Sequence, residues 1–187
     1  MNGKTLFNLT KRNFAASMYN YQNAANPRVY LTVAAGDKKL GDLVFELYAE
    51  QQPATTESFR ALCEGSATSE AGSSFVGTAF HQGQSGFGIS GGRMGDENVG
   101  AFGLRLMDED LTLRHNKRGQ LTLPNDGENS GGSEFTITFG EASYLDGYQA
   151  VFGELVEGHR VLDALEAGVD RLGNISEDFT IIDSGCK

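Results

Sequence analysis

The sequence after residue 27 is divided into short apolar segments by closely spaced turns. Residues 29–34 and 43–48 alternate apolar and polar side chains, and the turn GDKK at residues 36–39 lies between them, as in a β-hairpin. Turns recur about every 8–12 residues, which is typical of an all-β barrel or sandwich. Further strands are predicted at residues 86–90, 120–123, 135–139, 150–156 and 178–182.

Two helices are predicted among these strands. Pro53 occupies the first turn of one helix, in which Phe59 and Cys63 recur four residues apart on one face. The other helix is predicted over residues 158–167 and ends at Gly168. With so few helices and no internal repeat, the chain is expected to form one β-rich domain.

The charge of the chain is unevenly distributed. Its 187 residues carry 15 Lys and Arg against 25 Asp and Glu, a formal net charge of −10. Residues 1–36 contain four of the basic residues and no acidic one, so the remaining 151 residues carry a net charge of −14. Because phosphate contacts require Lys and Arg, this balance predicts no nucleic-acid partner. The apolar runs fall far short of the ~20 residues that cross a bilayer, so no transmembrane segment is predicted.

Residues 1–27 are interpreted as an N-terminal arm that precedes a barrel domain at residues 28–187. The arm contains Lys4, Lys11 and Arg12 with several hydroxyl groups and no acid. This composition is typical of a mitochondrial transit peptide, so a mitochondrial location is predicted. A disordered basic tail on a cytoplasmic protein is the alternative, and an arm that docks on a neighbouring protein is a third interpretation.

The ligand-forming residues of the chain are scattered. The histidines at positions 81, 115 and 159 are isolated, and the two cysteines show neither metal-ligand spacing nor the pattern of a disulfide framework. No metal and no cofactor are therefore predicted.

Two motifs resemble functional sites but have simpler explanations. Residues 86–91 match the dinucleotide fingerprint GxGxxG, yet no amphipathic helix follows them, so a chance match in a glycine-rich chain is favoured. The acidic residues 108–110 cannot converge on one point in an extended chain, because alternate side chains face opposite ways. A solvated turn is predicted there.

Four separated segments occur in the order and spacing of one protein family. They read FELYAEQQPATTESFRALCEG (45–65), FHQGQSGF (80–87), LPNDGENSGGSEFTI (123–137) and YLDGYQAVFGEL (144–155). In these segments the chain resembles a cyclophilin, over about residues 28–186. The resemblance implies an eight-stranded antiparallel barrel capped by two α-helices. It also implies a surface groove that, in active members, isomerises X-Pro peptide bonds.

The resemblance implies a chemistry without cofactor, metal or covalent intermediate. Resonance between nitrogen and carbonyl gives the peptide bond a rotational barrier of ~18–20 kcal/mol. In the family, an arginine donates a hydrogen bond to the proline nitrogen and so favours its pyramidal form. Amide donors hold the substrate carbonyls, and an apolar pocket holds the proline ring.

The positions that this chemistry requires are mostly changed in this chain. Gln82 stands where active cyclophilins have the arginine, and Gly88 stands where a pocket methionine is usual. Ser90 and Glu134 replace glutamines, and Thr136 replaces a pocket phenylalanine. Glu134 is expected to bring negative charge to the place of the substrate carbonyls. Loss of one preorganised donor costs ~10²–10³ in rate, so little or no isomerase activity is expected.

Other groove positions are retained or conservatively changed. The resemblance assigns a peptide-binding role to Phe87, which is retained. It assigns the same role to Asn125, Tyr144, Leu145 and Gln149, together with the changed Thr136. Phe87 is the retained pocket residue, whereas Tyr144 replaces a tryptophan and Gln149 a histidine.

Three functions are consistent with these residues. The leading hypothesis is a non-catalytic subunit of a larger, mitochondrial protein assembly, which contacts other subunits partly through residues 1–27 and holds a peptide segment in its groove. The first alternative is a weak peptidyl-prolyl isomerase that aids protein folding and uses Gln82 and Phe87. The second is a peptide-binding module that recognises a basic, non-proline motif through Glu134.

Overall fold

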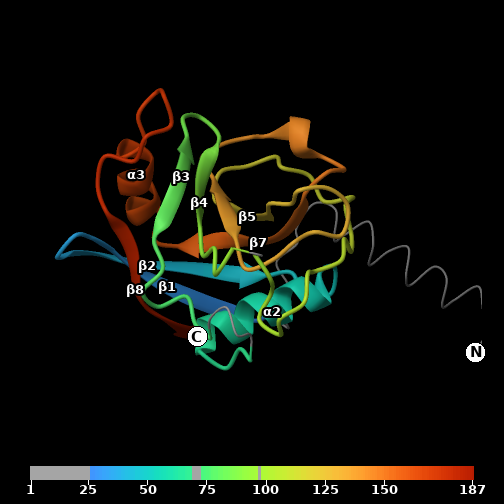
Figure 1. Ribbon diagram of the computed structural model, residues 1–187. Helices are drawn as coiled ribbons and strands as arrows, with labels where there is room; N and C mark the ends of the chain where they lie inside the picture. Colours follow the sequence, from blue (N-terminus) through green and yellow to red (C-terminus); the bar gives the residue numbers. More distant parts are fainter. Residues whose placement is uncertain (1–25, 69–72, 97) are drawn as a thin grey trace, which may run out of the picture.

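The computed structural model describes residues 26–68, 73–96 and 98–187, shown in Figure 1. The strands in this part of the chain are β1 (Arg28–Ala35), β2 (Lys38–Leu47), β3 (Phe80–Gln84), β4 (Gly88–Gly91), β5 (Gln120–Leu123), β6 (Phe135–Thr138), β7 (Ala150–Glu157) and β8 (Phe179–Cys186). The helices are α2 (Pro53–Glu64), α3 (His159–Ala167) and a 3₁₀ turn, η1 (Ser143–Leu145). The predicted arm lies outside the described residues, except for Asn26 and Pro27.

The strands form one antiparallel sheet that nearly closes on itself. Its order is β3-β4-β6-β5-β7-β2-β1-β8, so β3 and β8 are its two edges. These edges meet at a bridge between Ala79 and Thr180, and the Ile181 N–H donates to the Thr78 carbonyl at 2.9 Å. Helix α2 packs against β1 and β8, and α3 packs against β2 (Figure 1). The eight-stranded antiparallel barrel with two helices is therefore confirmed.

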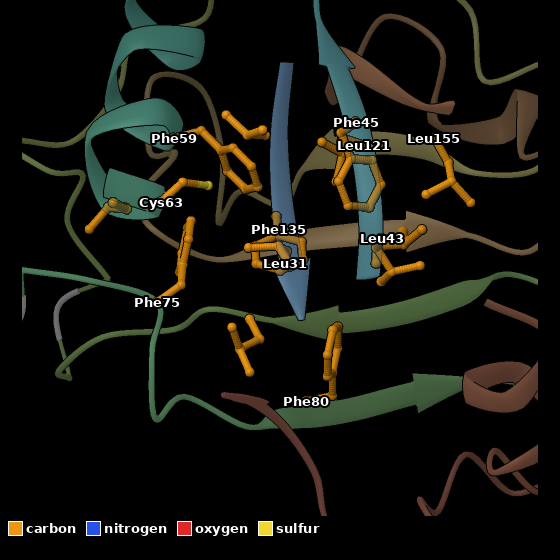
Figure 2. Close-up of a cluster of buried hydrophobic side chains, with 14 of the residues drawn as sticks. Leu31, Leu43, Phe45, Phe59, Cys63, Phe75, Phe80, Leu121, Phe135 and Leu155 are labelled. Atoms are coloured by element: carbon orange, nitrogen blue, oxygen red, sulfur yellow. The ribbon is translucent and has the colours of Figure 1, made fainter. Parts of the chain in front are cut away.

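Aromatic side chains join α2 to the inside of the barrel. The Phe59 ring lies 4.9 Å from the Phe75 ring and 5.2 Å from the rings of Phe135 and Phe152, measured between centroids. Figure 2 shows Phe59 and Cys63 pointing from the helix toward Phe75 and Phe135. Aromatic pairs at such separations add to the energy of apolar burial, so this cluster fixes α2 against the strands.

The hairpin and both helices were predicted at nearly their observed positions, but one strand was missed. Strand β3 has the sequence FHQGQ, in which three of five side chains are exposed and no apolar alternation occurs. The neighbouring strand begins at Gly88 rather than at residue 86, because Gly86 has a φ of 76° and belongs to the turn between β3 and β4. Strand β8 also continues four residues beyond its predicted end, to Cys186.

The acidic segment at residues 108–110 is part of the tertiary structure, so the prediction of a solvated turn was incomplete. The Glu109 carboxylate accepts hydrogen bonds from the N–H groups of Ala54 and Thr55, both at 3.0 Å. These donors lie in the first turn of α2, where the preceding Gln52 supplies no side-chain cap. A carboxylate at a helix N-terminus satisfies free N–H groups and interacts favourably with the helix dipole. Glu109 therefore ties a distant loop to α2.

None of the helices in the described ranges is long and apolar enough to cross a membrane.

We predict that Glu109→Ala lowers the free energy of unfolding by about 1 kcal/mol, because two N–H groups of α2 lose their acceptor. Urea denaturation at neutral pH measures this change. Glu128→Ala, which removes an exposed carboxylate from another loop, is the matched control and is expected to stay within about 0.5 kcal/mol of the parent protein. Equal losses in the two variants would contradict the capping role.

Candidate functional site

An open groove of about 140 Å³ lies over strands β3, β4 and β6, beside the beginning of β7. It contains six of the residues that the sequence marked as candidates, namely Gln82, Phe87, Ser90, Glu134, Thr136 and Gln149. Gly83, Gln84, Gly88 and Pro124 complete its lining. Residues separated by up to 67 positions in the chain are thus brought to one surface by the pairing of these strands.

The apolar wall of the groove is formed by Phe87. This residue lies in the turn between β3 and β4, where its N–H donates to the Gln84 carbonyl at 3.0 Å and its carbonyl accepts from the Phe139 N–H at 2.7 Å. Its ring lies 5.9 Å from the ring of Tyr144, with the planes inclined at 54°. Tyr144 therefore supports Phe87 from the rim and does not itself line the groove.

The floor of the groove is polar. Ser90 of β4 and Thr136 of β6 are directly paired across the sheet, and their hydroxyl oxygens are 2.7 Å apart. Gly88 lies two residues before Ser90 on β4. A Cβ atom added to Gly88 would lie 2.5 Å from the Ile137 carbonyl oxygen. A larger side chain at position 88 would therefore require β4 and β6 to move apart. This part of the groove therefore presents two hydroxyl groups and a glycine.

Glu134 is buried at the inner end of the groove and fully paired. Its Oε1 lies 3.1 Å from His81 Nε2, and its Oε2 accepts from Arg93 Nη1 at 2.9 Å. Hydrogen bonds from His81 and then Arg93 lower the pKa of the Glu134 carboxyl, although burial acts in the opposite direction. Glu134 is therefore ionised at neutral pH. The negative charge expected at Glu134 is therefore present in the groove lining, but it is paired with Arg93.

No described residue that lines the groove is cationic. Gln82 is exposed on β3, at the position to which the resemblance assigns the family's arginine. The nearby guanidinium of Arg93 binds Glu134 and donates from Nη2 to the Asp96 carbonyl at 3.2 Å.

The same stretch of chain matches a known family. Residues 30–185 match the family model described as cyclophilin type peptidyl-prolyl cis-trans isomerase/CLD. The chain belongs to this family. The match covers the barrel from β1 to β8, so the cyclophilin-type domain and the described fold coincide.

Three candidate residues of the cyclophilin-type domain lie outside the groove lining. Asn125 donates from Nδ2 to the Tyr148 carbonyl at 2.7 Å, which engages its side-chain amide at the groove margin. Leu145 belongs to the 3₁₀ turn η1 and is half-buried, and Tyr144 in the same turn contacts the groove only through Phe87.

Gln84 lines the groove but was not identified from the sequence. It follows Gln82 by two residues on β3, and such residues share one face of a strand. Residues 80–84 lack the apolar alternation by which a strand is recognised, so the shared face of Gln82 and Gln84 was not predicted.

A chain of hydrogen bonds runs from the groove into the barrel wall behind it. Thr122 Oγ1 lies 3.2 Å from Gln149 Oε1 and 3.1 Å from His115 Nε2, and His115 Nδ1 lies 3.0 Å from Asp146 Oδ1. His115 and Thr122 are completely buried. Burial lowers the pKa of His115, and the hydrogen bond to Asp146 opposes that effect. His115 was judged isolated in the sequence, yet in the fold it is joined to the groove.

No group of three or more His, Cys, Asp or Glu that could bind a metal occurs within the described parts of the chain.

We predict that Glu134→Gln lowers the free energy of unfolding by about 1–3 kcal/mol at pH 7, because the charged hydrogen bond to Arg93 is lost. Since the folded-state pKa of Glu134 is lowered, its stabilising effect is present above the unfolded-state pKa of about 4.3 and disappears as the pH falls through the folded-state value. The difference in the free energy of unfolding between the parent protein and Glu134→Gln should therefore shrink below about pH 4.3. Urea denaturation at a series of pH values tests this, with Glu128→Gln as control, and a difference independent of pH would contradict the pairing.

Proposed function

We propose that this cyclophilin-type domain is a non-catalytic subunit of a larger mitochondrial protein assembly and that its groove holds a peptide segment without isomerising it. The observation that carries the proposal is that none of the described residues lining the groove is cationic, and that Gln82 stands at the position of the family's arginine. The X-Pro bond isomerises slowly because amide resonance must be broken. A neutral, shorter amide at position 82 stabilises the pyramidal nitrogen less than a guanidinium would.

Arg93 does not replace the missing cation. Its two terminal nitrogens donate to the Glu134 carboxylate and to the Asp96 carbonyl. Withdrawing Arg93 from these contacts would leave a largely buried carboxylate without its charged partner, which is costly. Arg93 is therefore retained by Glu134 and is not available to a substrate nitrogen.

The polar floor also weakens the grip on proline. A proline ring gains binding energy from apolar area removed from water, at roughly 25 cal/mol per Å². Here the ring would contact Phe87 on one side and the hydroxyls of Ser90 and Thr136 on the other. Gly88 adds no side chain to this surface. A peptide held in this groove would depend more on polar contacts than a substrate of an active family member does.

Phe87 favours a weak isomerase as the second candidate function. Its ring is positioned by Tyr144 and lines an open groove, so part of the family's pocket persists. The third candidate, recognition of a basic motif through Glu134, has less support, because both of its carboxylate oxygens already have partners.

The proposed place in an assembly is supported by the surface of the barrel and by the arm. Phe102, Leu104 and Met107 lie close together in one loop and expose 50%, 73% and 69% of their surface. Apolar side chains exposed together are typical of surfaces that bind other proteins. Residues 1–25 contain three basic residues and no acid, and they precede a strongly acidic domain. This composition is the basis for proposing mitochondrial targeting and contact with neighbouring subunits.

We predict that the parent protein accelerates isomerisation of an Ala-Pro peptide less than about tenfold in a protease-coupled assay, since the cation and pocket walls are changed. Gln82→Arg combined with Glu134→Gln should raise the catalysed rate about tenfold or more, because restoring one preorganised donor changes rates by up to ~10²–10³. Gly88 is left unchanged, as a side chain there would meet the Ile137 carbonyl.

The matched control for this gain is Gln84→Arg combined with Glu134→Gln. It places the same charge on the same face of β3, two residues from position 82. An equal gain in the control would show that charge alone suffices. Strong turnover by the parent protein that is lost in Phe87→Ala would favour the weak-isomerase function instead.

We predict that removing residues 2–25 abolishes the mitochondrial location of the protein in cells, and that the purified truncated chain has a lower native mass than the full-length chain after each is added to a mitochondrial extract. The deletion spares all described strands and helices. Gel filtration and cell fractionation of tagged full-length and truncated chains measure the two effects. A full-length chain that elutes near 20.1 kDa and remains in the cytoplasm would contradict both parts of the proposal.

A further inference from the structure

We propose that Gln149 determines the hydrogen-bonding polarity of the groove and that His115 is the positioning residue that sets the orientation of its amide, through Thr122. The inference rests on the proposed function of the groove as a peptide-binding surface. It concerns which end of the Gln149 amide, the NH₂ group or the carbonyl, is presented to a bound peptide.

Asp146 determines which nitrogen of His115 carries a proton. Its Oδ1 atom accepts from the His115 main-chain N–H at 2.8 Å and lies 3.0 Å from Nδ1 of the same residue. A carboxylate can only accept hydrogen bonds, so Nδ1 must be protonated to face it. In neutral His115 the other ring nitrogen, Nε2, therefore bears a lone pair and must accept a hydrogen bond.

The hydroxyl of Thr122 passes this constraint to Gln149. It has a single proton and lies within hydrogen-bond distance of both His115 Nε2 and the Gln149 amide. When His115 is neutral, Thr122 donates to Nε2, and its oxygen can only accept from the Gln149 NH₂ group. The amide carbonyl is then the end that faces the groove.

Protonation of His115 reverses the donor and acceptor roles along this series of hydrogen bonds. Nε2 then donates to the Thr122 oxygen, and the Thr122 hydroxyl donates to Gln149 Oε1, which is the amide orientation in the structure. The NH₂ group of Gln149 is then directed to the groove and can donate to a peptide carbonyl. One proton on a completely buried ring thus exchanges an acceptor for a donor in the groove lining.

Few polar groups contact the ring of His115. Asp146, beside η1, is the ionisable group bonded to the ring, whereas β5 presents the Thr122 hydroxyl and the start of β7 presents the Gln149 amide. Because burial lowers the pKa of His115, the reversal is expected below the ordinary histidine value of about 6.5.

NMR of the ¹⁵N-labelled full chain tests the coupling without any ligand. The Gln149 side-chain NH₂ resonances should shift with the same midpoint as the His115 ring nitrogens during a pH titration, and neutral His115 should show the Nδ1–H form. Thr122→Val, which removes the hydroxyl at similar size, should abolish the shift of Gln149, and Thr122→Ser should restore it. The proposal would be overturned if the Gln149 resonances did not shift with the titration of His115, or if they shifted equally in Thr122→Val.

Peptide binding provides the second readout. A capped Ala-Ala-Pro-Phe peptide should bind about three- to tenfold more tightly when His115 is protonated, because one hydrogen bond to a peptide carbonyl is gained. The affinity of Thr122→Val should be independent of pH over the same range. Absence of binding at every pH would contradict the proposed function, whereas the amide titration of the free protein would still decide the role of His115. Binding with the same pH dependence in Thr122→Val would overturn that role.

Discussion

The pairing of β4 with β6 is the constraint on which the candidate site depends. Alternation along β6 directs Phe135 and Ile137 into the aromatic and aliphatic core, and it directs Glu134 and Thr136 to the groove. The groove is therefore built on the same strand that anchors the core. A slip of one residue in this register would exchange the two faces, so the energy of core packing also fixes the positions of the groove side chains.

The same pairing supports the proposal that the groove does not carry out the family's chemistry. Close contact between Gly88 and the Ile137 carbonyl leaves no room for a side chain at position 88, and the hydroxyls of Ser90 and Thr136 are hydrogen-bonded to each other at the floor. Glu134 brings a charge that must be neutralised when buried, and it engages Arg93 for that purpose. Arg93 is thus engaged in the structure, which supports the proposal of a groove that binds without catalysis.

The sequence was sufficient to predict the fold and most of the groove, because both depend on local patterns and on motifs in a fixed order. Residues such as Gln82, Phe87 and Thr136 could be assigned to one surface by resemblance. Strand β3 was missed because its exposed, glycine-containing sequence carries no alternation. The partners of Glu134 and the link from Gln149 to His115 could not be predicted, since they join residues from separate strands and loops, and such contacts depend on side-chain geometry.

The central claim is that the groove of this cyclophilin-type domain does not isomerise the X-Pro bond. Two-dimensional exchange NMR of an Ala-Pro peptide with the full chain measures this directly, because it follows the interconversion of cis and trans forms at equilibrium. If the claim is correct, the two forms will interconvert over tens of seconds or more, as they do in free peptides. Exchange cross-peaks at mixing times of about one second or less would show catalysis and would contradict the claim.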